Sequence, residues 1–389
     1  MKDGWKIHKY GKTLEWRLKG IREHKLCSET NAKYLLEFQD YLFAEGLSIP
    51  RVAKYLRLLC GIDKRISHKD LKQVDKKDVI QLLTNLEQSN YSEWTKSDYK
   101  IGLKKFYKWM NNGILPEHVS WVKSIIKNKK RMLPQEILSP EEIINMIEEA
   151  GSERNKALIG CLYESGCRIG ELMTLKLKHI SFDKYGVIFM VNGKTGVRRV
   201  RIISSSNLIG RWLNTHPDKK NQNSYLWCRL KQANEMLGYA SFIKLLRKTA
   251  KKAEVSKRVN PHSFRHARAT HMANKLTEAQ MKEYFGWVQG SNMASIYVHL
   301  SGRDVDKAVL NYYGIDKVEE KPDAMQPITC NCGEINTPTN NYCNKCGKPL
   351  KTEVAVDIDN QKDKAKNKLN KLMKNPEFVE FMQKMVMKE

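Results

Sequence analysis

The sequence reads HSFRHARATHM over residues 262–272 and FGWVQGSNMASIYVHL over residues 285–300. His262 and Arg265 are three residues apart, so both lie on one face of a predicted helix. In the second stretch, Tyr297 follows Trp287 by ten residues. Alternation of such helical stretches with short connections predicts a helical unit that carries an imidazole, a guanidinium, an indole and a phenol.

Two stretches upstream add further candidates, YESGCRIGELMTL at residues 163–175 and NGKTGVRRVRI at residues 192–202. Arg168 comes just after Gly166 and near a predicted helix start. Lys194 stands at the tip of a predicted hairpin, because the Asn-Gly pair before it favours a tight turn.

These residue types suit the cleavage of a phosphodiester bond. The reaction requires a nucleophile, a proton donor for the leaving oxygen and positive groups for the non-bridging oxygens, where charge builds in the transition state. Arginine suits the last role because it stays ionised and its planar fork matches phosphate geometry. A tyrosine hydroxyl, with a pKa near 10, becomes a nucleophile when cations or a base favour its anion. A lysine can protonate the leaving 5′ oxygen.

Each residue alone has a plainer interpretation. Arg168 could pair with Glu171 or with a core carbonyl. His262 and His266, four residues apart, could form a metal pair, but the sequence lacks a HExxH motif, and the adjacent Arg265 would repel a cation. The joint pattern carries the interpretation.

Taken together, the four stretches resemble the conserved boxes of the tyrosine recombinase and integrase family. The resemblance is strong over 139–312 and looser over the N-terminal part. It implies a 3′-phosphotyrosine intermediate, with Tyr297 as the nucleophile. It also implies two arginines on the non-bridging oxygens, a histidine that assists proton movement, a lysine as general acid, and a tryptophan that supports the site. The implied catalytic residues are Arg168, Lys194, His262, Arg265, Trp287 and Tyr297.

The resemblance further implies catalysis without a divalent metal or other cofactor. Members of this family assemble as homotetramers on two double-stranded DNA sites and hand a C-terminal helix to the neighbouring subunit; residues 303–312 are the candidate. The function expected is site-specific DNA recombination, as the integrase of a mobile element. Alternatives are Xer-like resolution of chromosome or plasmid dimers, a DNA-binding protein with this fold and no activity, and a type IB topoisomerase.

The charge supports a nucleic-acid partner. The 389 residues contain 69 Lys plus Arg against 43 Asp plus Glu, a formal net charge of +26. Such a surplus repels itself in the compact state and is best explained by a polyanion. A ribosomal or other RNA-associated protein, or a basic soluble enzyme, would share this composition. No stretch approaches the ~20 apolar residues of a membrane helix, and no signal peptide is apparent, so we expect a cytoplasmic protein.

The expected fold is mainly α with a small β-sheet. It comprises a helical core-type DNA-binding domain, an α+β catalytic domain and a small zinc ribbon. The predicted segments are the helical domain (1–115), a basic linker (116–138), the catalytic domain (139–315), a second linker (316–327), the ribbon (328–350) and a charged amphipathic tail helix (351–389).

Within the helical domain, the sequence predicts helices over 31–43, from Ser48 and Pro50 onwards, after Asp75, and over 93–110. The last of these is rich in lysine and aromatic residues, and a solvated face and a DNA-facing surface explain it equally well. In the catalytic domain, Ser139 and Pro140 predict a helix start. Further helices are predicted over 207–214, 239–253, 262–275, 277–285 and 291–299.

Nine cysteines are present, and four are clustered at Cys330, Cys332, Cys343 and Cys346. An odd total without secretory features argues against a disulfide framework. The cluster resembles a zinc ribbon, which implies structural Zn²⁺, and a unit this small would need the ion to fold. The first pair is Cys-x-Cys, one residue tighter than the usual knuckle, so the alternative is a degenerate ribbon that holds no metal. Recombinases with such tails suggest an archaeal source.

The C-terminal residues 363–389 predict a basic and then apolar helix. Its large side chains would pack on a partner subunit or on the rest of the chain. They are Leu369, Leu372, Met373, Phe378, Phe381, Met382 and Met385.

Overall fold

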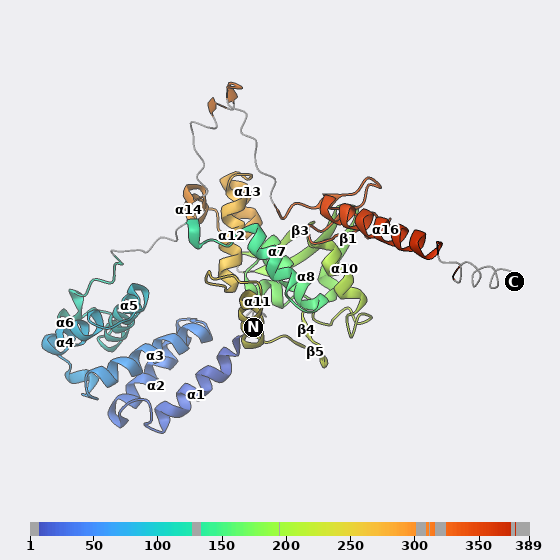
Figure 1. Ribbon diagram of the computed structural model, residues 1–389. Coiled ribbons are helices and arrows are strands. Elements are labelled where there is room, and N and C mark those ends of the chain that lie inside the picture. Colours follow the sequence, from blue (N-terminus) through green and yellow to red (C-terminus); the bar gives the residue numbers. More distant parts are fainter. Residues whose placement is uncertain are drawn as a thin grey trace. The chain divides into compact units, whose positions relative to one another are not determined.

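The computed structural model describes residues 8–126, 134–193, 195–300, 309–310, 312–315, 324–374 and 378. The chain divides into two compact units, Met1–Met132 and Leu133–Glu389 (Figure 1). Most of the described chain is helical and the strands form small sheets, which confirms the predicted fold class. The finer domain boundaries stay a prediction. None of the described helices is both long and apolar enough to cross a membrane.

The first unit is a bundle of helices, and the predicted helices in it are confirmed. Ser28 caps α2 by accepting from the Asn31 backbone N–H at 3.3 Å, and Asp75 caps α4. The elements are α1 (Tyr10–Arg22), α2 (Glu29–Ala44), α3 (Ile49–Arg65), the 3₁₀ turn η2 (Leu71–Gln73), α4 (Lys76–Glu87), α5 (Glu93–Met110) and α6 (Glu117–Ser120).

The core of this unit combines aromatic packing with one buried polar network. Phe38 is fully buried and meets the edge of Phe106, with ring centroids 5.3 Å apart. The buried carboxylate of Asp63 accepts from the Asn31 side chain at 2.6 Å and from the Ser28 backbone at 3.2 Å. Because each buried polar group has a partner, the network fixes how α2 meets α3.

Several lysines of α5 have partners within the unit. Lys100 pairs with Glu87 at 2.6 Å and Lys105 with Glu45 at 2.6 Å. Lys104 donates to the Val122 carbonyl at 3.1 Å. These lysines therefore stabilise the bundle by pairing within it. Neither a solvated face nor a DNA-facing surface alone explains the basic character of α5.

The second unit surrounds a three-stranded antiparallel sheet with helices. Ser139 and Glu142 form a reciprocal capping box at the start of α7, as the sequence predicts. Up to residue 300 the elements are η3 (Pro134–Glu136), α7 (Pro140–Glu148), α8 (Glu153–Glu164), α9 (Ile169–Met173), η4 (Leu177–His179), β1 (Ile180–Asp183), β2 (Gly186–Gly193), β3 (Gly196–Ile202), α10 (Ser206–Asn214), β4 (Cys228–Arg229), β5 (Gln232–Met236), α11 (Tyr239–Lys252), α12 (Pro261–Ala273), α13 (Glu278–Phe285) and α14 (Met293–Leu300).

The hairpin is confirmed and the strands meet within the predicted turn segment 192–196, but the Asn-Gly pair has a different place from the one expected. Gly193 pairs with Gly196 across β2 and β3, so Asn192 and Gly193 end a strand and do not form the turn. A Cβ at Gly193 would lie 2.3 Å from the Glu171 carboxylate. This glycine therefore serves close approach to α9, not the turn geometry. Strand β1 and the short pair β4–β5 were not predicted.

Helices α12, α13 and α14 enclose a separate apolar cluster, which includes Phe285, Trp287 and Tyr297. Gly286 ends α13 with φ +60°, a left-handed conformation that glycine adopts without strain. This turn directs Trp287 back toward α14.

The C-terminal part holds β6 (Ile328–Thr329), β7 (Ile335–Asn336) and α16 (Thr352–Leu372). No residue of α16 is buried, and Leu369, Leu372 and Met373 are exposed. The tail helix begins at Thr352, within the predicted segment 351–389 and earlier than residue 363. Residues 381, 382 and 385 lie outside the described residues, as does most of the predicted helix 303–312.

Candidate active site

Arg168 occupies the N-cap of α9, as the sequence predicts, and its side chain is fixed at both ends. Nη1 donates to Glu171 Oε1 at 2.9 Å, and Nη2 donates to the Gly286 carbonyl at 3.0 Å. The side chain remains about one third exposed (32%), so its guanidinium is oriented but still accessible.

Glu171 is a buried carboxylate that joins two arginines. Its Oε2 accepts from Arg198 at 2.8 Å and from the Arg168 backbone N–H at 3.0 Å. Burial raises the pKa of this carboxyl, but the charges of Arg198 and Arg168 outweigh burial and hold the pKa below its ordinary value. Glu171 therefore remains ionised and links β3 to α9.

Arg265 lies deeper in the site and donates to two carbonyls, Gly166 at 2.6 Å and Phe285 at 2.7 Å. Its guanidinium also lies 5.5 Å from the Trp287 ring centroid. Burial, with the positive charge of Arg168 nearby, lowers the pKa of Arg265 to about 10. The Arg265 guanidinium stays charged at neutral pH, and a bound anion would stabilise this buried charge.

Tyr297 is buried on α14 and stacks on Trp287, with ring centroids 5.5 Å apart and an interplanar angle of 1°. Its hydroxyl lies 2.5 Å from His266 Nδ1. Burial raises the pKa of the phenol to about 12, against the opposing effect of Arg265. The phenol is therefore held as the neutral acid.

The two histidines of α12 that line the pocket, His262 and His266, have lowered pKa values and are uncharged at neutral pH. Burial, with the charges of Arg265 and Arg168, lowers the pKa of His262. Burial, His262 and Arg265 lower the pKa of His266. Their ring centroids are 6.3 Å apart. An uncharged imidazole can accept a proton, which an imidazolium cannot.

These side chains line one pocket of about 410 Å³. Five of the six predicted catalytic residues are thus brought together. Lys194, the sixth, lies outside the described residues, although the next residue, Thr195, lines the pocket. The pocket wall consists of Arg168, Thr195, His262, Arg265, His266, Gly286, Trp287, Val288, Ser291, Met293 and Tyr297. Two guanidinium groups and a phenol at one concave surface suit attack on an anionic phosphoester.

Sequence reasoning missed two members of this constellation. The sequence suggests His266 only as one member of a metal pair, yet it holds the Tyr297 hydroxyl. Arg198, on β3, donates to Glu171 and to the Tyr284 carbonyl at 3.2 Å. For Arg198, the available signal in the sequence was the Arg198-Arg199 pair that follows the predicted hairpin turn.

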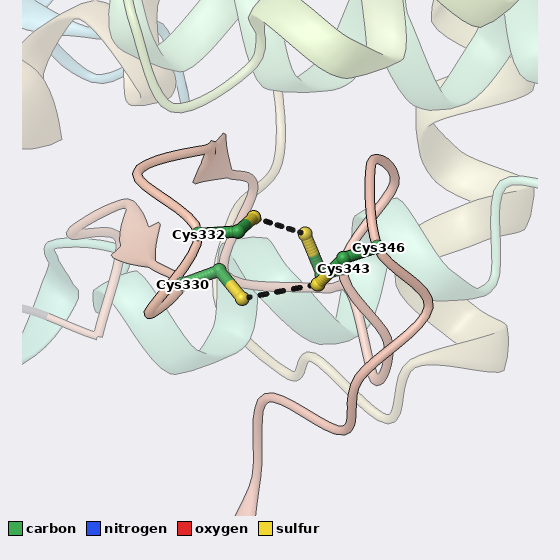
Figure 2. Close-up of side chains that lie close together, drawn as sticks. All are labelled: Cys330, Cys332, Cys343 and Cys346. Carbon is green, nitrogen blue, oxygen red and sulfur yellow. Dashed lines mark hydrogen bonds between the residues drawn. The ribbon is translucent and has the colours of Figure 1, made fainter.

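A second cluster comprises Cys330, Cys332, Cys343 and Cys346, all with free thiols (Figure 2). The four sulfur atoms lie within 4.8 Å of one another. Cys330 and Cys346 sulfurs are 3.5 Å apart, and those of Cys332 and Cys343 are 3.6 Å apart. Such a grouping could bind a metal ion, and the tight Cys-x-Cys pair does not keep either sulfur away.

The Asn336 side chain supports the second cluster. This buried amide donates toward Cys343 Sγ at 3.6 Å, and its oxygen accepts from the Asn344 backbone at 3.0 Å. The N–H group directed at a sulfur favours the thiolate form, which metals require.

Comparison with known proteins identifies two regions. Residues 130–303 match the profile of the Phage integrase family, and residues 35–112 match the Phage integrase, N-terminal SAM-like domain. The chain is 27% identical over 285 residues to Tyrosine recombinase XerA of Pyrococcus horikoshii, covering 72% of this chain and 93% of the relative. It is 25% identical over 246 residues to Tyrosine recombinase XerC of Anoxybacillus flavithermus, covering 60% and 80%.

Two solved structures share the fold. The lambda integrase dimer bound to a COC′ core site matches with a TM-score of 0.58 and 17% identity, covering 77% of this chain and 83% of that one. The XerH recombinase bound to palindromic difH substrate, a post-cleavage complex, matches with a TM-score of 0.56 and 19% identity, covering 80% and 98%. The two profile matches, the recombinase relatives and the shared fold agree, and the chain belongs to the phage integrase family of tyrosine recombinases.

Proposed function

We propose that Tyr297 is the nucleophile with which this site-specific recombinase cleaves and rejoins DNA. The observation that carries the proposal is the pocket itself, in which the phenol shares about 410 Å³ with Arg168 and Arg265. Attack by the phenolic oxygen on the scissile phosphate forms a 3′-phosphotyrosine and releases a 5′ hydroxyl. Because the phosphoester bond is stored, the reverse reaction rejoins the strand without a high-energy cofactor.

The other residues have distinct roles in this proposal. Arg168 and Arg265 hold the non-bridging oxygens, where their charge is worth most in the transition state. Trp287 supports the ring of Tyr297 by stacking on it. Lys194 protonates the leaving 5′ oxygen, and the pocket position of its neighbour Thr195 supports that role. His262 assists proton movement.

The test is a nicked suicide duplex that carries the cognate site, so that the cleaved end diffuses away and cleavage cannot reverse. We expect a covalent protein–DNA adduct that survives denaturation and is lost in Tyr297→Phe. The matched control is Tyr185→Phe, a change at an exposed tyrosine outside the pocket, which should leave the adduct intact. Retention of the adduct in Tyr297→Phe would refute the assignment. Tight site binding without any adduct would favour a DNA-binding protein of this fold.

We further infer that the partner is double-stranded DNA bound as a homotetramer on two sites. Helix α11 supports the DNA contact, because one side of it lines a basic hollow of about 730 Å³ with Lys244, Arg247, Lys248 and Lys251. Arginine and lysine in such a hollow suit phosphate oxygens. Mass measurement of the protein with one-site and two-site duplexes tests the assembly. Sequencing of recombination junctions in the source genome distinguishes integration of a mobile element from dimer resolution.

The cysteine cluster is proposed to hold structural Zn²⁺. A tetrahedral site with Zn–S bonds of about 2.3 Å places its sulfurs about 3.8 Å apart. The 3.5 and 3.6 Å separations fit this value. Gly333 and Gly347, which follow the two cysteine pairs, adopt φ of 86° and 71° and so turn the backbone around the sulfurs. The ion would cross-link the loop of Cys330 and Cys332 to the loop of Cys343 and Cys346, which have little apolar core of their own.

Elemental analysis of the purified chain tests this site. We expect one zinc per chain, and its loss in Cys343→Ser. The matched control is Cys228→Ser, a buried thiol outside the cluster, which should keep the zinc. Absence of zinc in the native chain would favour the degenerate ribbon.

A further inference from the structure

The Tyr297 hydroxyl is held by one side chain that the expected reaction scheme does not use. Among the residues that the structure describes, His266 is the hydrogen-bond partner of this hydroxyl, at 2.5 Å. His266 lies on α12, one residue beyond Arg265, so it is positioned by the same helix that carries the deeper arginine. The ring centroids of His266 and Tyr297 are 5.7 Å apart.

The direction of this hydrogen bond follows from the surroundings. Burial, with His262 and Arg265 as neighbours, keeps the His266 ring uncharged. Burial likewise keeps the phenol protonated. The phenolic O–H must then donate to Nδ1, and the ring carries its own proton on Nε2. His266 is thus an available base in contact with the acid that must be deprotonated.

The groups around Tyr297 and His266 favour transfer of the phenolic proton to the imidazole only when an anion is bound in the pocket. Arg265, Arg168 and His262 lie on the pocket side, and the indole of Trp287 covers the other face of the phenol. An imidazolium at His266 would be repelled by the Arg265 guanidinium. A bound phosphate offsets that repulsion, so the proton is taken up when the substrate is in place.

We propose that His266 is the general base for strand cleavage, accepting the phenolic proton at Nδ1 as Tyr297 attacks phosphorus. This inference rests on the proposed function. As the Oη–P bond forms, the P–O5′ bond breaks and Lys194 gives a proton to the leaving oxygen. His266 ends the step with one additional proton and Lys194 with one fewer. On rejoining, the same residues return the protons in reverse, with no outside reactant.

His262 has a different place in this scheme. It shares the pocket but its ring lies one helical turn away, with its centroid 6.3 Å from that of His266. Its neighbours, Arg265 and Arg168, are the groups proposed to hold the phosphate oxygens. His262 therefore contacts the phosphate side of the site, and His266 contacts the nucleophile.

The experiment compares His266→Asn with Lys194→Ala on two suicide duplexes. Asn retains an acceptor near the place of Nδ1 but cannot hold a proton. One duplex is ordinary, and the other has sulfur in place of the bridging 5′ oxygen, a leaving group that needs no protonation. We expect His266→Asn to lower the rate of adduct formation about a hundredfold or more on both duplexes. Lys194→Ala should be slow on the ordinary duplex and restored by sulfur.

The pH profile supplies a second readout. Wild-type cleavage should be independent of pH in the neutral range, because burial, His262 and Arg265 hold the pKa of His266 below its ordinary value. In His266→Asn, the rate should rise about tenfold per pH unit toward the phenol's pKa of about 12, since hydroxide must then remove the proton. Equal thermal stability and equal site binding of the variant confirm that it is folded.

Two outcomes would overturn the proposal: a wild-type rate and pH profile in His266→Asn, or restoration of this variant by the sulfur duplex. The second result would place His266 on the leaving group. Failure of the proposed function is distinguishable, because wild-type protein would then form no adduct on either duplex.

A separate observation concerns helix α16. It is 21 residues long, buries none of them, and its charge changes sign along its length. Its acidic residues, Glu353, Asp357, Asp359 and Asp363, lie at or before residue 363, together with Lys362. From there to residue 374 follow only basic charges, on Lys364, Lys366, Lys368, Lys371 and Lys374.

Such a helix is poorly stabilised by itself. Lysines four residues apart, such as Lys364 and Lys368, repel each other, and exposed helices gain little from propensity. A second copy of the same basic segment would add to the repulsion. A polyanion removes it, and the geometry points to phosphates of duplex DNA beyond the core recombination site as the partner of α16.

The test combines a quadruple variant, with Gln at positions 364, 366, 368 and 371, and a matched variant with Arg at the same four lysines. On a long duplex, the salt dependence of binding should become shallower by up to about 3.6 units in the Gln variant. It should be unchanged in the Arg variant. Adduct formation on a duplex limited to the core site should be equal in all three proteins. An unchanged salt slope in the Gln variant would refute the DNA contact, with or without a change in oligomeric mass.

Discussion

Glu171 offers the sharpest test of how the site is built. Its two carboxylate oxygens accept from Arg168 Nη1, Arg198 Nη2 and the Arg168 backbone at 2.8 to 3.0 Å. In Glu171→Gln, one oxygen becomes an NH₂ group that must face a guanidinium or a backbone N–H. Three donors then compete for a single acceptor, and the neutral amide leaves two arginines without their counter-charge.

The size of the effect follows from burial. Glu171 is 5% exposed and Arg198 10%, whereas Arg168 is 32% exposed and can turn to water. Removing one member of a buried ion pair costs about 3–5 kcal/mol. Gln keeps one hydrogen bond and most of the volume, which offsets part of this cost. We therefore expect the free energy of unfolding of the catalytic unit to fall by about 3 kcal/mol.

Urea denaturation measures this change, and Glu149→Gln is the matched control. Glu149 is a half-exposed carboxylate that lies 3.6 Å from Lys252, so its loss should cost less than about 0.5 kcal/mol. The rate of adduct formation should also fall in Glu171→Gln, because Arg168 loses one of the two contacts that orient it. A change in stability below about 1 kcal/mol with an unaltered rate would refute the buried-pair reasoning.

The same carboxyl predicts a dependence on pH. Its pKa in the folded protein lies below the ordinary value near 4.5, because Arg198 and Arg168 outweigh the effect of burial. Its stabilising contribution is therefore complete above that ordinary value and is lost as pH falls through the lower, folded value. The wild-type protein should lose more stability on acidification than Glu171→Gln, and the two unfolding curves should converge.

Three further substitutions have definite expected outcomes. Gly166→Ala should lower the unfolding free energy by about 2–3 kcal/mol, because φ is +55° and the new Cβ would lie 2.3 Å from Phe285; thermal denaturation measures it. Phe38→Ala should lower the free energy of unfolding of the first unit by about 3–5 kcal/mol, because a fully buried ring is lost; urea denaturation of the protein measures it. Trp287→Ala should slow adduct formation while Trp287→Phe retains most of the rate, because a ring still stacks on Tyr297.

The helices could be predicted because their signals are local. Of the predicted helix starts, Asp75 and Ser139 make the side-chain cap hydrogen bonds, whereas Ser48 occupies the N-cap of α3 without one. Only a few neighbouring residues determine such a start. The Asn-Gly pair shows the limit of local reasoning. A tertiary requirement, the approach of Glu171 to Gly193, explains that glycine better than the turn does.

Family resemblance could assign the arginines, histidines and phenol to one site. It could not predict the hydrogen-bond partners of these side chains. Arg198 meets the Tyr284 carbonyl across 86 positions of sequence, and His266 meets Tyr297 across 31. No periodicity predicts such pairs, since they depend on how β3 and α14 approach α12 and α13. The four cysteines are the opposite case, because their close spacing alone brought the sulfurs together.

The three arginines around the pocket differ in what neutralises them, and this difference explains how the site can be stable without DNA yet ready to bind it. Arg198 pairs with Glu171 through Nη2 and donates from Nε to the Tyr284 carbonyl, so it serves structure. Arg168 shares that carboxylate and remains one third exposed. Among the described residues, Arg265 has only carbonyl oxygens as hydrogen-bond partners, and its lowered pKa reports a charge that burial penalises. A phosphate that enters the pocket therefore gains most from Arg265 and next from Arg168. The fold thus stores an unbalanced positive charge next to a protonated phenol, and only an anionic substrate both relieves the charge and makes the proton's departure favourable.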